Sequence, residues 1–496
     1  TDGSIYIFLH INSINYNICV KVSLASTAHY SAEAAESIKD LNPNAADVLI
    51  TSVITSMVTD IGVVSPTSGA LLSYYDGQSS SFHTTDGYFN APSSFNGNDQ
   101  EEHRISMTYG GYVETCKGGN TFAIPGIYKV LNTIHERFGS IPLTKLFEYP
   151  IKIAKEGFNL PQPSKDYLKH SLEPLFMWHA TSKQTLSEVY KNLDSGVVVL
   201  TKLADTLEHM SLDGMDDFYK GDISKELLST IMSEGGHATK EDFENYNLLE
   251  DYNFVTKFKD LKLIGNAGPS IGGLMVLKYL EALQTSKPNL KENLLNVYKE
   301  RKAHYEFFGD REQFINNQIS KITQSPSTIQ VNTSDDSNNH FSITFSSGYG
   351  SGVQCKNTGM YLNNSLGEIE LNPQGFLGDT KNERLISNMS PMIIETNKGI
   401  STIGSPGADR ISSALAQVIL NFSHIENWGQ AISKPRFHVN SDGTVRCEPG
   451  ADNKFINEIV TSHNDMYFGG VCVTGLYDKL LSYGDPRRGN SSWSND

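Results

Sequence analysis

The sequence has too little positive charge for a protein that binds nucleic acid. Its 496 residues include 40 Lys and Arg against 56 Asp and Glu, which gives a formal net charge of −16. Nucleic-acid binding needs a basic face, so we expect no nucleic-acid partner. The chain also lacks an apolar run of the ~18 residues that a membrane-spanning helix needs. No spanning segment is therefore predicted.

The common cofactor and metal motifs are missing as well. The cysteines form no CxxC pair, so no zinc site is predicted. There is no P-loop, HExxH, EF-hand or GxSxG pattern, and we expect no metal and no cofactor. The odd cysteine count leaves two possibilities open, two disulfide bridges with one free thiol or five separate thiols. The five are Cys19, Cys116, Cys355, Cys447 and Cys472.

The C-terminal third carries the pattern of a secreted protein. Five Asn-x-Ser/Thr sequons, the acceptor pattern for N-glycosylation, all follow residue 330. The chain begins at Thr1 rather than Met, from which we expect that an N-terminal signal was removed. We predict a secreted, extracellular glycoprotein. The glycosylation candidates are Asn332, Asn363, Asn388, Asn421 and Asn490.

The chain divides into a helical part and a strand-rich part. After residue 325 short strands predominate, with one clear helix at 407–422. The stretch 325–363 is the central one, because it predicts a hairpin that starts at Ser and Thr residues and ends in a glycine-rich turn. A second strand pair is predicted at 71–75 and 81–84. The apolar spacing predicts further helices at 31–41, 45–61, 127–138, 143–156, 165–180, 199–211, 223–234, 270–285 and 289–308.

Longer motifs stand in order along nearly the whole chain after residue 25. They include GVVSPTSGALLSYYDG at 62–77, TTDGYFNAP at 84–92, GMYLNN at 359–364, SNMSPMII at 387–394, GSPGADRI at 404–411, PRFHVN at 435–440 and GDPRRG at 484–489. Segments 120–160, 203–250 and 266–283 fit the same series. Together these motifs resemble those of the γ-glutamyltransferases, also called glutathione hydrolases.

The resemblance implies an α+β protein with the N-terminal-nucleophile hydrolase fold, in which two sheets are sandwiched between helices (αββα). It implies a large-subunit-like region at 1–325 and a small-subunit-like region at 326–496 that form one interlocked unit. Active members of this family cut themselves before a Thr, whose hydroxyl attacks a γ-glutamyl carbonyl while its freed amine acts as base. Backbone N–H groups of a Gly pair stabilise the oxyanion. An Arg binds the substrate α-carboxylate, and an acidic residue binds the α-amine.

The sequence departs from that family pattern at the nucleophile and at the carboxylate-binding Arg. Ungapped alignment places Pro326 at the nucleophile position, and a one-residue shift places Ser327 there, with Thr328 next. The Arg position after Asp-Gly holds Tyr88, whose neutral hydroxyl offers one hydrogen bond in place of a charged bidentate pair. Losing such a charged bond costs about 1.5–3 kcal/mol. Thr344 of the second strand matches the family.

The remaining site positions are a mixture of matches and changes. Ser346 replaces an Asn on the second strand, and Glu368 stands where the acidic ligand of the α-amine is expected. The family's Ser-Ser pair is Ser387-Asn388, and its Gly-Gly pair is Gly407-Ala408. The degenerate substrate-binding site is therefore predicted at Tyr88, Ser346, Glu368, Ser387, Asn388, Gly407 and Ala408.

Two functions follow from these matches and changes. The first is a secreted, catalytically inactive and uncleaved relative that acts as a binding or assembly component, with a protein partner or as a homo-oligomer. Arrays of catalytic groups act as units, so several changes together favour this hypothesis. The alternative is an active γ-glutamyl hydrolase or transferase that cuts itself near 325–328 and uses Ser327 or Thr328, in which case γ-glutamyl compounds are its substrates.

Overall fold

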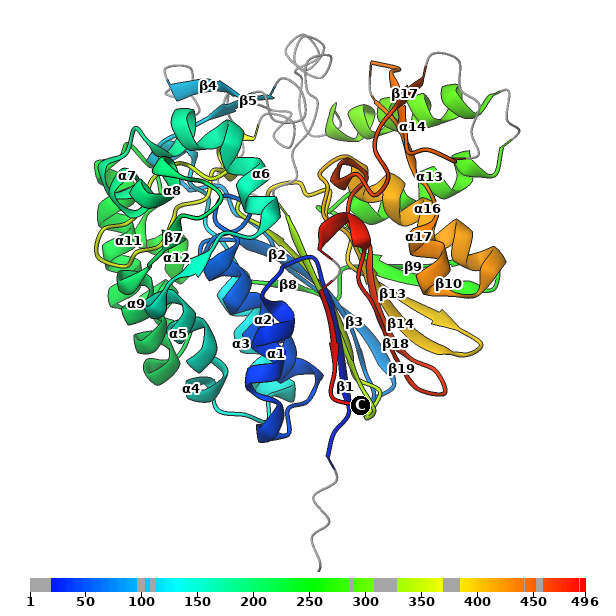
Figure 1. Cartoon of the computed structure of the whole chain (residues 1–496), viewed down its shortest axis with the longest axis horizontal. Coiled ribbons are helices and arrows are strands. Elements are labelled where there is room, and N and C mark those ends of the chain that lie inside the picture. The colour runs from blue at the N-terminus through cyan, green and yellow to red at the C-terminus, as the bar shows by residue number, and fades with distance from the viewer. Residues whose placement is uncertain are drawn as a thin grey trace, which may run out of the picture.

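Two stacked antiparallel sheets occupy the middle of the molecule, and helices cover both outer faces (Figure 1). This computed structural model describes residues 19–95, 103–107, 113–285, 289–306, 328–368, 384–440, 442–451, 458–489 and 491–496. Within 289–306, side chains are described up to residue 299. The arrangement is the αββα sandwich that the sequence resemblance implies.

The first sheet has seven strands drawn from both parts of the chain. Their order is β20 (Ser491–Ser494), β1 (Val22–Ser26), β11 (Ile329–Asp335), β12 (His340–Ser346), β2 (Gly69–Asp76), β3 (Ser81–Gly87) and β8 (Leu249–Glu250). The predicted hairpin is therefore β11 and β12 at the centre of this sheet. The predicted strand pair at 71–75 and 81–84 is β2 and β3.

The second sheet has six strands, again from both parts of the chain. Their order is β19 (Leu480–Tyr483), β18 (Cys472–Leu476), β14 (Gly399–Gly404), β13 (Met392–Thr396), β10 (Leu261–Asn266) and β9 (Asn253–Phe258). Because each sheet mixes strands from before and after residue 325, the two parts interlock. The boundary itself lies outside the described residues and stays a prediction.

Small sheets lie at the periphery. They are formed by β4 (Arg104–Met107) with β5 (Val113–Cys116), by β6 (Phe158–Asn159) with β7 (Val197–Val198), and by β15 (Phe437–Val439), β16 (Val445–Cys447) and β17 (Glu458–Val460).

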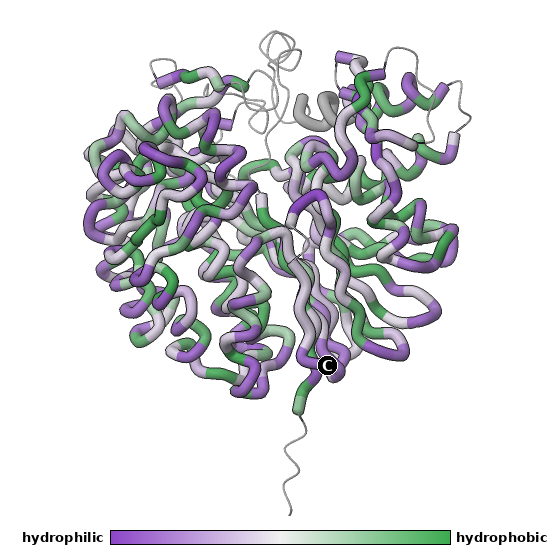
Figure 2. The backbone as a smooth tube through the Cα atoms, viewed as in Figure 1, coloured by the Kyte–Doolittle hydropathy of each residue, from purple (hydrophilic) through white to green (hydrophobic). Residues whose placement is uncertain are grey.

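The helices between residues 31 and 244 lie on the side of the first sheet. They are α1 (Ser31–Ser37), α2 (Ala45–Thr59), α3 (Ile127–Phe138), α4 (Leu143–Leu146), α5 (Glu148–Glu156), α6 (Gln162–Ser171), α7 (Ala180–Thr185), α8 (Ser187–Lys191), α9 (Thr201–Asp213), α10 (Asp217–Lys220), α11 (Asp222–Ser233) and α12 (Lys240–Glu244). The second sheet is covered by α13 (Gly272–Leu283), α14 (Leu290–Glu306), α16 (Arg410–Ile425) and α17 (Trp428–Ser433). The outer helices alternate purple and green in Figure 2, as amphipathic helices do.

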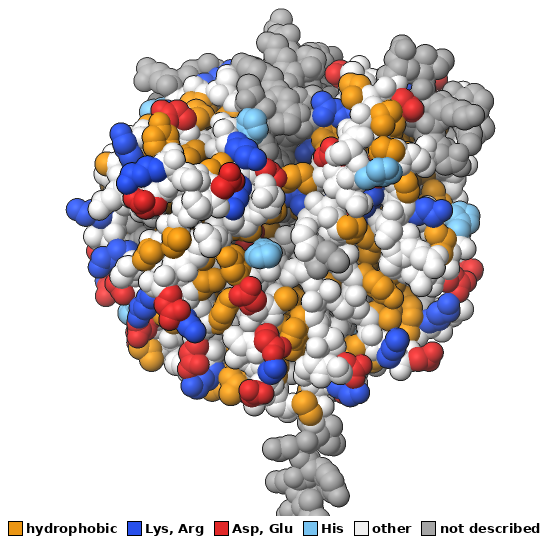
Figure 3. All heavy atoms as spheres, in the orientation of Figure 1, with side chains coloured by type: hydrophobic (Ala, Val, Ile, Leu, Met, Phe, Trp, Pro, Cys, Tyr) orange, Lys and Arg blue, Asp and Glu red, His pale blue; other side chains and the backbone are white. Residues whose placement is uncertain are grey.

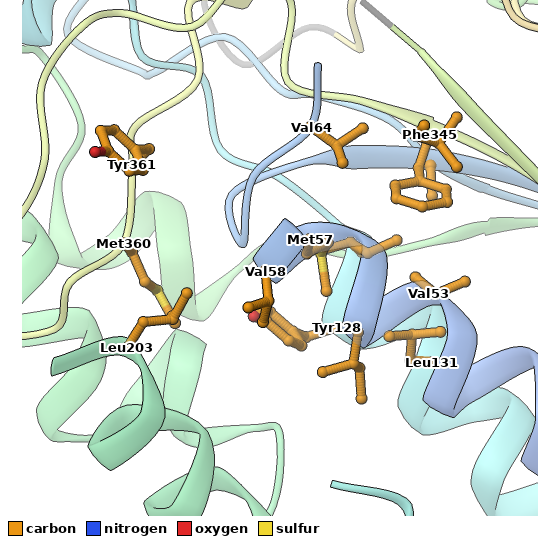
Figure 4. Packing of buried hydrophobic residues seen from close by; sticks show 14 of the residues in the cluster. Val53, Met57, Val58, Val64, Tyr128, Leu131, Leu203, Phe345, Met360 and Tyr361 are labelled. Atoms are coloured by element: carbon orange, nitrogen blue, oxygen red, sulfur yellow. The ribbon is translucent and has the colours of Figure 1, made fainter. Parts of the chain in front are cut away.

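Helix α2 is buried along its whole length, as its apolar composition predicts. Asn44 starts it, because its side chain accepts hydrogen bonds from the backbone N–H groups of Ala46 and Asp47 while Asp47 bonds back to Asn44 N. In Figure 4 side chains of α2, including Val53, lie between those of β12 and α3. This contact fixes the outer face of the central hairpin.

Several predicted helices have other boundaries than expected: the helix predicted at 143–156 is divided into α4 and α5, and those predicted at 199–211 and 270–285 start two residues later. The spacing predicts 407–422, whereas α16 begins at Arg410. Gly407 and Ala408 have φ of 131° and 52°, which are outside the right-handed helical region. These two residues therefore belong to the loop before the helix.

The five cysteines are separate thiols, four of them buried and Cys19 exposed. Of the two possibilities left open by the sequence, the structure has the one without bridges. Acidic and basic side chains are interspersed over the face shown in Figure 3. Within the described ranges, no helix has the length and apolar character to cross a bilayer.

Candidate functional site

The central hairpin presents polar side chains to the second sheet. Along β11 and β12, Ile329, Val331, Phe341, Ile343 and Phe345 belong to the apolar core on the helical side. Because side chains alternate along a strand, the intervening ones face β14 and β18. Two hydrogen bonds to the second sheet confirm this: Asn332 Nδ2 donates to Cys472 O at 2.6 Å, and Ser342 Oγ donates to Ile403 O at 3.0 Å.

The residue directly opposite Thr344 is Gln330. The Thr344 hydroxyl donates to Gln330 Oε1 at 2.5 Å, and Gln330 Nε2 donates to Asn332 Oδ1 at 2.6 Å and to Ser342 Oγ at 3.1 Å. All four side chains are fully buried. The amide of Gln330 therefore joins the hydroxyls of the hairpin into a closed hydrogen-bond network.

Gln330 also fills the gap to the second sheet. A Cβ on Gly404 would lie 2.2 Å from the Gln330 side-chain amide, so glycine is required where β14 meets this side chain. The sequence prediction missed Gln330. Strand alternation and the predicted register could have found it, because Thr344 was already assigned to the facing strand.

The two nucleophile candidates are placed differently. Thr328 is buried and directly precedes the first residue of β11, Ile329. Ser327 lies outside the described residues.

The loop that matches the family's Gly pair keeps an unusual backbone. Ala408 adopts the left-handed conformation (φ 52°), which costs a residue with a Cβ about 1–2 kcal/mol. The next residue, Asp409, was not predicted as a site residue. Its carboxylate lies 2.6 Å from Arg410 Nη1. Ala408 thus has a backbone conformation that favours glycine, and the Asp409–Arg410 ion pair lies beside it.

Ser387 and Asn388 lie in the loop that precedes β13 and are both buried. Ser387 Oγ accepts a hydrogen bond from Met389 N at 3.1 Å, and Ser387 O accepts one from Ile271 N at 2.9 Å. Asn388 shares a cavity of about 10 Å³ with Asp409, which is about the space of one water molecule. The structure thus brings the Ser-Asn pair and the Gly-Ala loop together.

Tyr88 is buried in an apolar cluster with Phe89 and Leu385. Its ring lies edge-on to Phe89, 4.7 Å between centroids, and a Cβ on Gly69 would lie 3.1 Å from it. Its carbonyl accepts hydrogen bonds from Tyr246 Oη and, at 2.5 Å, from Arg384 Nη1. Tyr88 thus packs against Gly69 at the start of β2.

Arg384 is a further residue that the sequence prediction missed. It is nearly buried, and its Nε lies 3.7 Å from Asp86 Oδ1. Burial raises the pKa of the Asp86 carboxyl, and the Arg384 charge opposes that rise. Because Arg384 is 298 positions from Asp86 in the chain, no local pattern could have paired them.

Ser346 and Glu368 border the same glycine. Ser346 Oγ accepts a hydrogen bond from Gly348 N at 3.1 Å, and a Cβ on Gly348 would lie 3.0 Å from Glu368 Cδ. Both side chains are buried. Two of the predicted substrate-binding residues are thus brought together at the end of β12.

The structure excludes a glycan at two of the five sequons. Asn363 is fully buried, and its Nδ2 donates to Thr67 O at 3.0 Å and to Ala123 O at 2.9 Å. Asn332 is also fully buried, between the two sheets. A sugar on either amide would displace these bonds and the packing around them.

The other three sequons differ in their exposure. Asn388 is buried, Asn421 is partly exposed on α16, and Asn490 lies outside the described residues. Over the described ranges, no three His, Cys, Asp or Glu side chains gather as metal ligands would.

The chain is similar to known proteins over most of its length. A family model described as gamma-glutamyltranspeptidase matches residues 31–315 and 299–492. The glutathione hydrolase proenzyme of Bacillus subtilis (strain 168) is 24% identical over 503 residues, covering 88% of this chain and 84% of that protein. Scoloptoxin SSD14 of Scolopendra dehaani is 25% identical, with the same coverage of 88% and 84%.

Among solved structures, cephalosporin acylase from Bacillus halodurans superposes with a TM-score of 0.72 at 18% identity, and 96% of each chain is covered. At 18% identity this comparison supports the fold alone. The two-sheet sandwich is therefore shared with that protein over nearly its entire length.

Proposed function

This chain belongs to the gamma-glutamyltranspeptidase family, and we propose that it is a secreted member that has lost catalysis, stays uncut and acts as a binding or assembly component. The observation that carries the proposal is the pairing of Thr344 with Gln330. A carboxamide is a poor nucleophile and does not titrate near neutral pH, so it cannot act as a general base. It accepts the hydrogen bond of the Thr344 hydroxyl, and the Ser342 hydroxyl donates to Ile403 O.

The surroundings of the hairpin support the same proposal. Tyr88 packs among apolar side chains at the position of the carboxylate-binding Arg, and a neutral phenol cannot replace a charged bidentate partner. At the position of the family's Gly pair, Ala408 adds a Cβ to the loop whose backbone N–H groups stabilise the oxyanion in active members.

The secreted location rests on the sequons that the fold leaves accessible and on the sequence composition. Asn421, partly exposed, is the best-placed glycan acceptor among the described residues. If the protein is expressed in secreting eukaryotic cells, it should appear in the medium and lose mass on removal of N-glycans. An Asn421→Gln variant should lose part of that mass shift, whereas Asn363→Gln should leave it unchanged.

An active γ-glutamyl hydrolase or transferase is the second candidate. The observation that favours it is the left-handed conformation at Ala408, a conformation suited to the glycine that the family pattern has at this position. Thr344, Glu368 and Ser387 match the family pattern or nearly so. Thr328, at the start of β11, would then be the nucleophile, or Ser327 before it.

Two measurements on the full-length protein separate the candidates. Intact mass and a denaturing gel should show one chain near 54.8 kDa, and a γ-glutamyl anilide should release no anilide above the buffer rate. Two fragments split near 325–328, together with anilide release that Thr328→Ala or Ser327→Ala abolishes, would establish the active enzyme instead. Ser337→Ala, which changes an exposed hydroxyl in the turn of the same hairpin, is the matched control.

A further inference from the structure

Strand β9 is the outer strand of the second sheet, and β10 is its only strand neighbour in the part of the chain described. The opposite edge of the same sheet is tied to the first sheet. There Ser23 Oγ donates to Leu481 O at 3.0 Å, and Ser482 Oγ donates to Leu24 O at 2.5 Å. The two edges therefore differ, and the edge at β9 is the open one.

The register of the β9–β10 hairpin shows which backbone groups point away from the sheet. Phe258 pairs with Leu261 at the two-residue turn, and Ala267 N donates to Tyr252 O at 2.8 Å at the other end. In an antiparallel pair, hydrogen-bonded residues alternate. Even-numbered residues of β9 therefore bond to β10, whereas Asn253, Val255 and Lys257 direct their N–H and C=O groups outward.

The side chains along this edge leave it open to pairing with another strand. Val255 is 56% exposed and Tyr252 is 59% exposed, so apolar surface accompanies the outward backbone groups. An exposed strand edge is a template for pairing with another chain. The charges are also asymmetric, because Asp251 precedes the strand and Lys259 follows it.

We propose that β9 pairs in antiparallel fashion with β9 of a second copy of this chain, across a two-fold axis at Val255. In that register Val255 lies opposite its own copy, and Asn253 lies opposite Lys257. All three outward residues of each strand are then paired, which gives about six main-chain hydrogen bonds. A shift by two residues leaves an outward residue at each end without a partner.

The charges fit this register. The two-fold axis places the Asp251 end of one strand beside the Lys259 end of the other, so the two ends carry opposite charges. Within each copy Asp251 also contacts His83, and Lys259 Nζ donates to Ser423 Oγ. Lys257, a residue type that commonly guards an edge against pairing, faces the neutral Asn253 instead of a like charge. The patch is self-complementary, as an interface across a two-fold axis must be.

The contact joins two six-stranded sheets into one continuous sheet. The interface is short, so its affinity should be in the micromolar range and the dimer should depend on concentration. The inference is independent of whether the family site is active.

The first test compares two lysine variants by sedimentation velocity over a concentration series. Wild-type protein should shift from monomer to dimer as concentration rises. Val255→Lys places two like charges face to face at the axis and should shift the dissociation constant at least tenfold or leave only monomer. Val460→Lys, at a valine that is 58% exposed on β17, is the matched control and should dimerise like the wild type.

The second test traps the dimer covalently. A Val255→Cys variant in a Cys19→Ser background should form a disulfide-linked dimer under mild oxidation, because Cα atoms of such a pair are about 5.5 Å apart. Val460→Cys in the same background should not. The proposal is wrong if the wild type stays monomeric and Val255→Cys fails to cross-link, or if a wild-type dimer forms equally well with Val255→Lys.

Discussion

Replacing Asp485 by Asn should destabilise the fold strongly, because Asp485 is the centre of a buried ionic network. Its carboxylate accepts hydrogen bonds from Arg436 Nη2 at 2.7 Å, Val471 N at 2.7 Å and Arg487 N at 3.0 Å. Arg487 also pairs with Glu448, and all four charged side chains are at most 2% exposed. The network joins the two motifs PRFHVN and GDPRRG, which the sequence contains 43 residues apart.

The charge balance of the network gives the expected magnitude. Two guanidinium groups face two carboxylates, so Asp485→Asn leaves one buried positive charge without compensation. Removing one partner of a buried pair costs about 3–5 kcal/mol. Asn has nearly the same volume as Asp, so the loss is electrostatic and not a cavity effect. Burial already lowers the pKa of Arg436, and the charge of Asp485 opposes that change.

Urea unfolding of the wild type and two variants tests this magnitude. Asp496→Asn is the matched control, since Asp496 forms an exposed pair with Lys21 at 2.5 Å and exposed pairs contribute about 0–1 kcal/mol. The midpoint for Asp485→Asn should fall far below that for Asp496→Asn. Added salt should weaken the Asp496–Lys21 pair more than the buried network. Equal midpoints for the two variants would refute the argument from burial.

Three further changes test other parts of the structure. Ala408→Gly should stabilise the protein by about 1 kcal/mol in urea unfolding, because it relieves the left-handed strain; no gain would mean that the loop is unstrained. Burial lowers the pKa of His340 to about 3 in the folded state, whereas the pKa of an unfolded His is about 6.5. Between about pH 6.5 and 3 only the unfolded chain is protonated at His340, so the free energy of unfolding falls as the pH drops through this range. At pH 5 the wild type should lose about 2 kcal/mol more than His340→Gln, and parallel pH profiles would contradict this. Gly404→Ala should lower the thermal midpoint because of its clash with Gln330, and Gln330→Ala should restore part of the loss if that contact is the cause.

Much of the fold could be predicted from periodicity and ordered motifs. The apolar composition of α2 predicts that this helix is buried. The apolar alternation on both sides of a polar turn predicts the hairpin β11–β12. Boundaries were less certain, because the first turn of α16 depends on backbone angles at Gly407 and Ala408. A one-dimensional pattern does not report such angles.

The site was only partly predictable. Thr344, Glu368 and Ser387 could be assigned because they stand at fixed distances from motif residues. Gln330 was missed although the register of the predicted hairpin places it opposite Thr344. Arg384 could not be assigned, since its partner Asp86 lies in a distant segment of the chain. The same limit explains the sequons, where Asn363 matches the acceptor pattern but is buried by residues hundreds of positions away.

By itself the sequence determined the family, the order of helices and strands, and the residue types that stand at each family position. These depend on local composition and on motifs that are contiguous in the chain. Only the tertiary structure decided what those residues contact: that an amide faces Thr344, that Tyr88 packs among apolar side chains, and that β9 keeps an open edge. Such facts depend on strand register and on burial, which arise when segments far apart in the chain pack together.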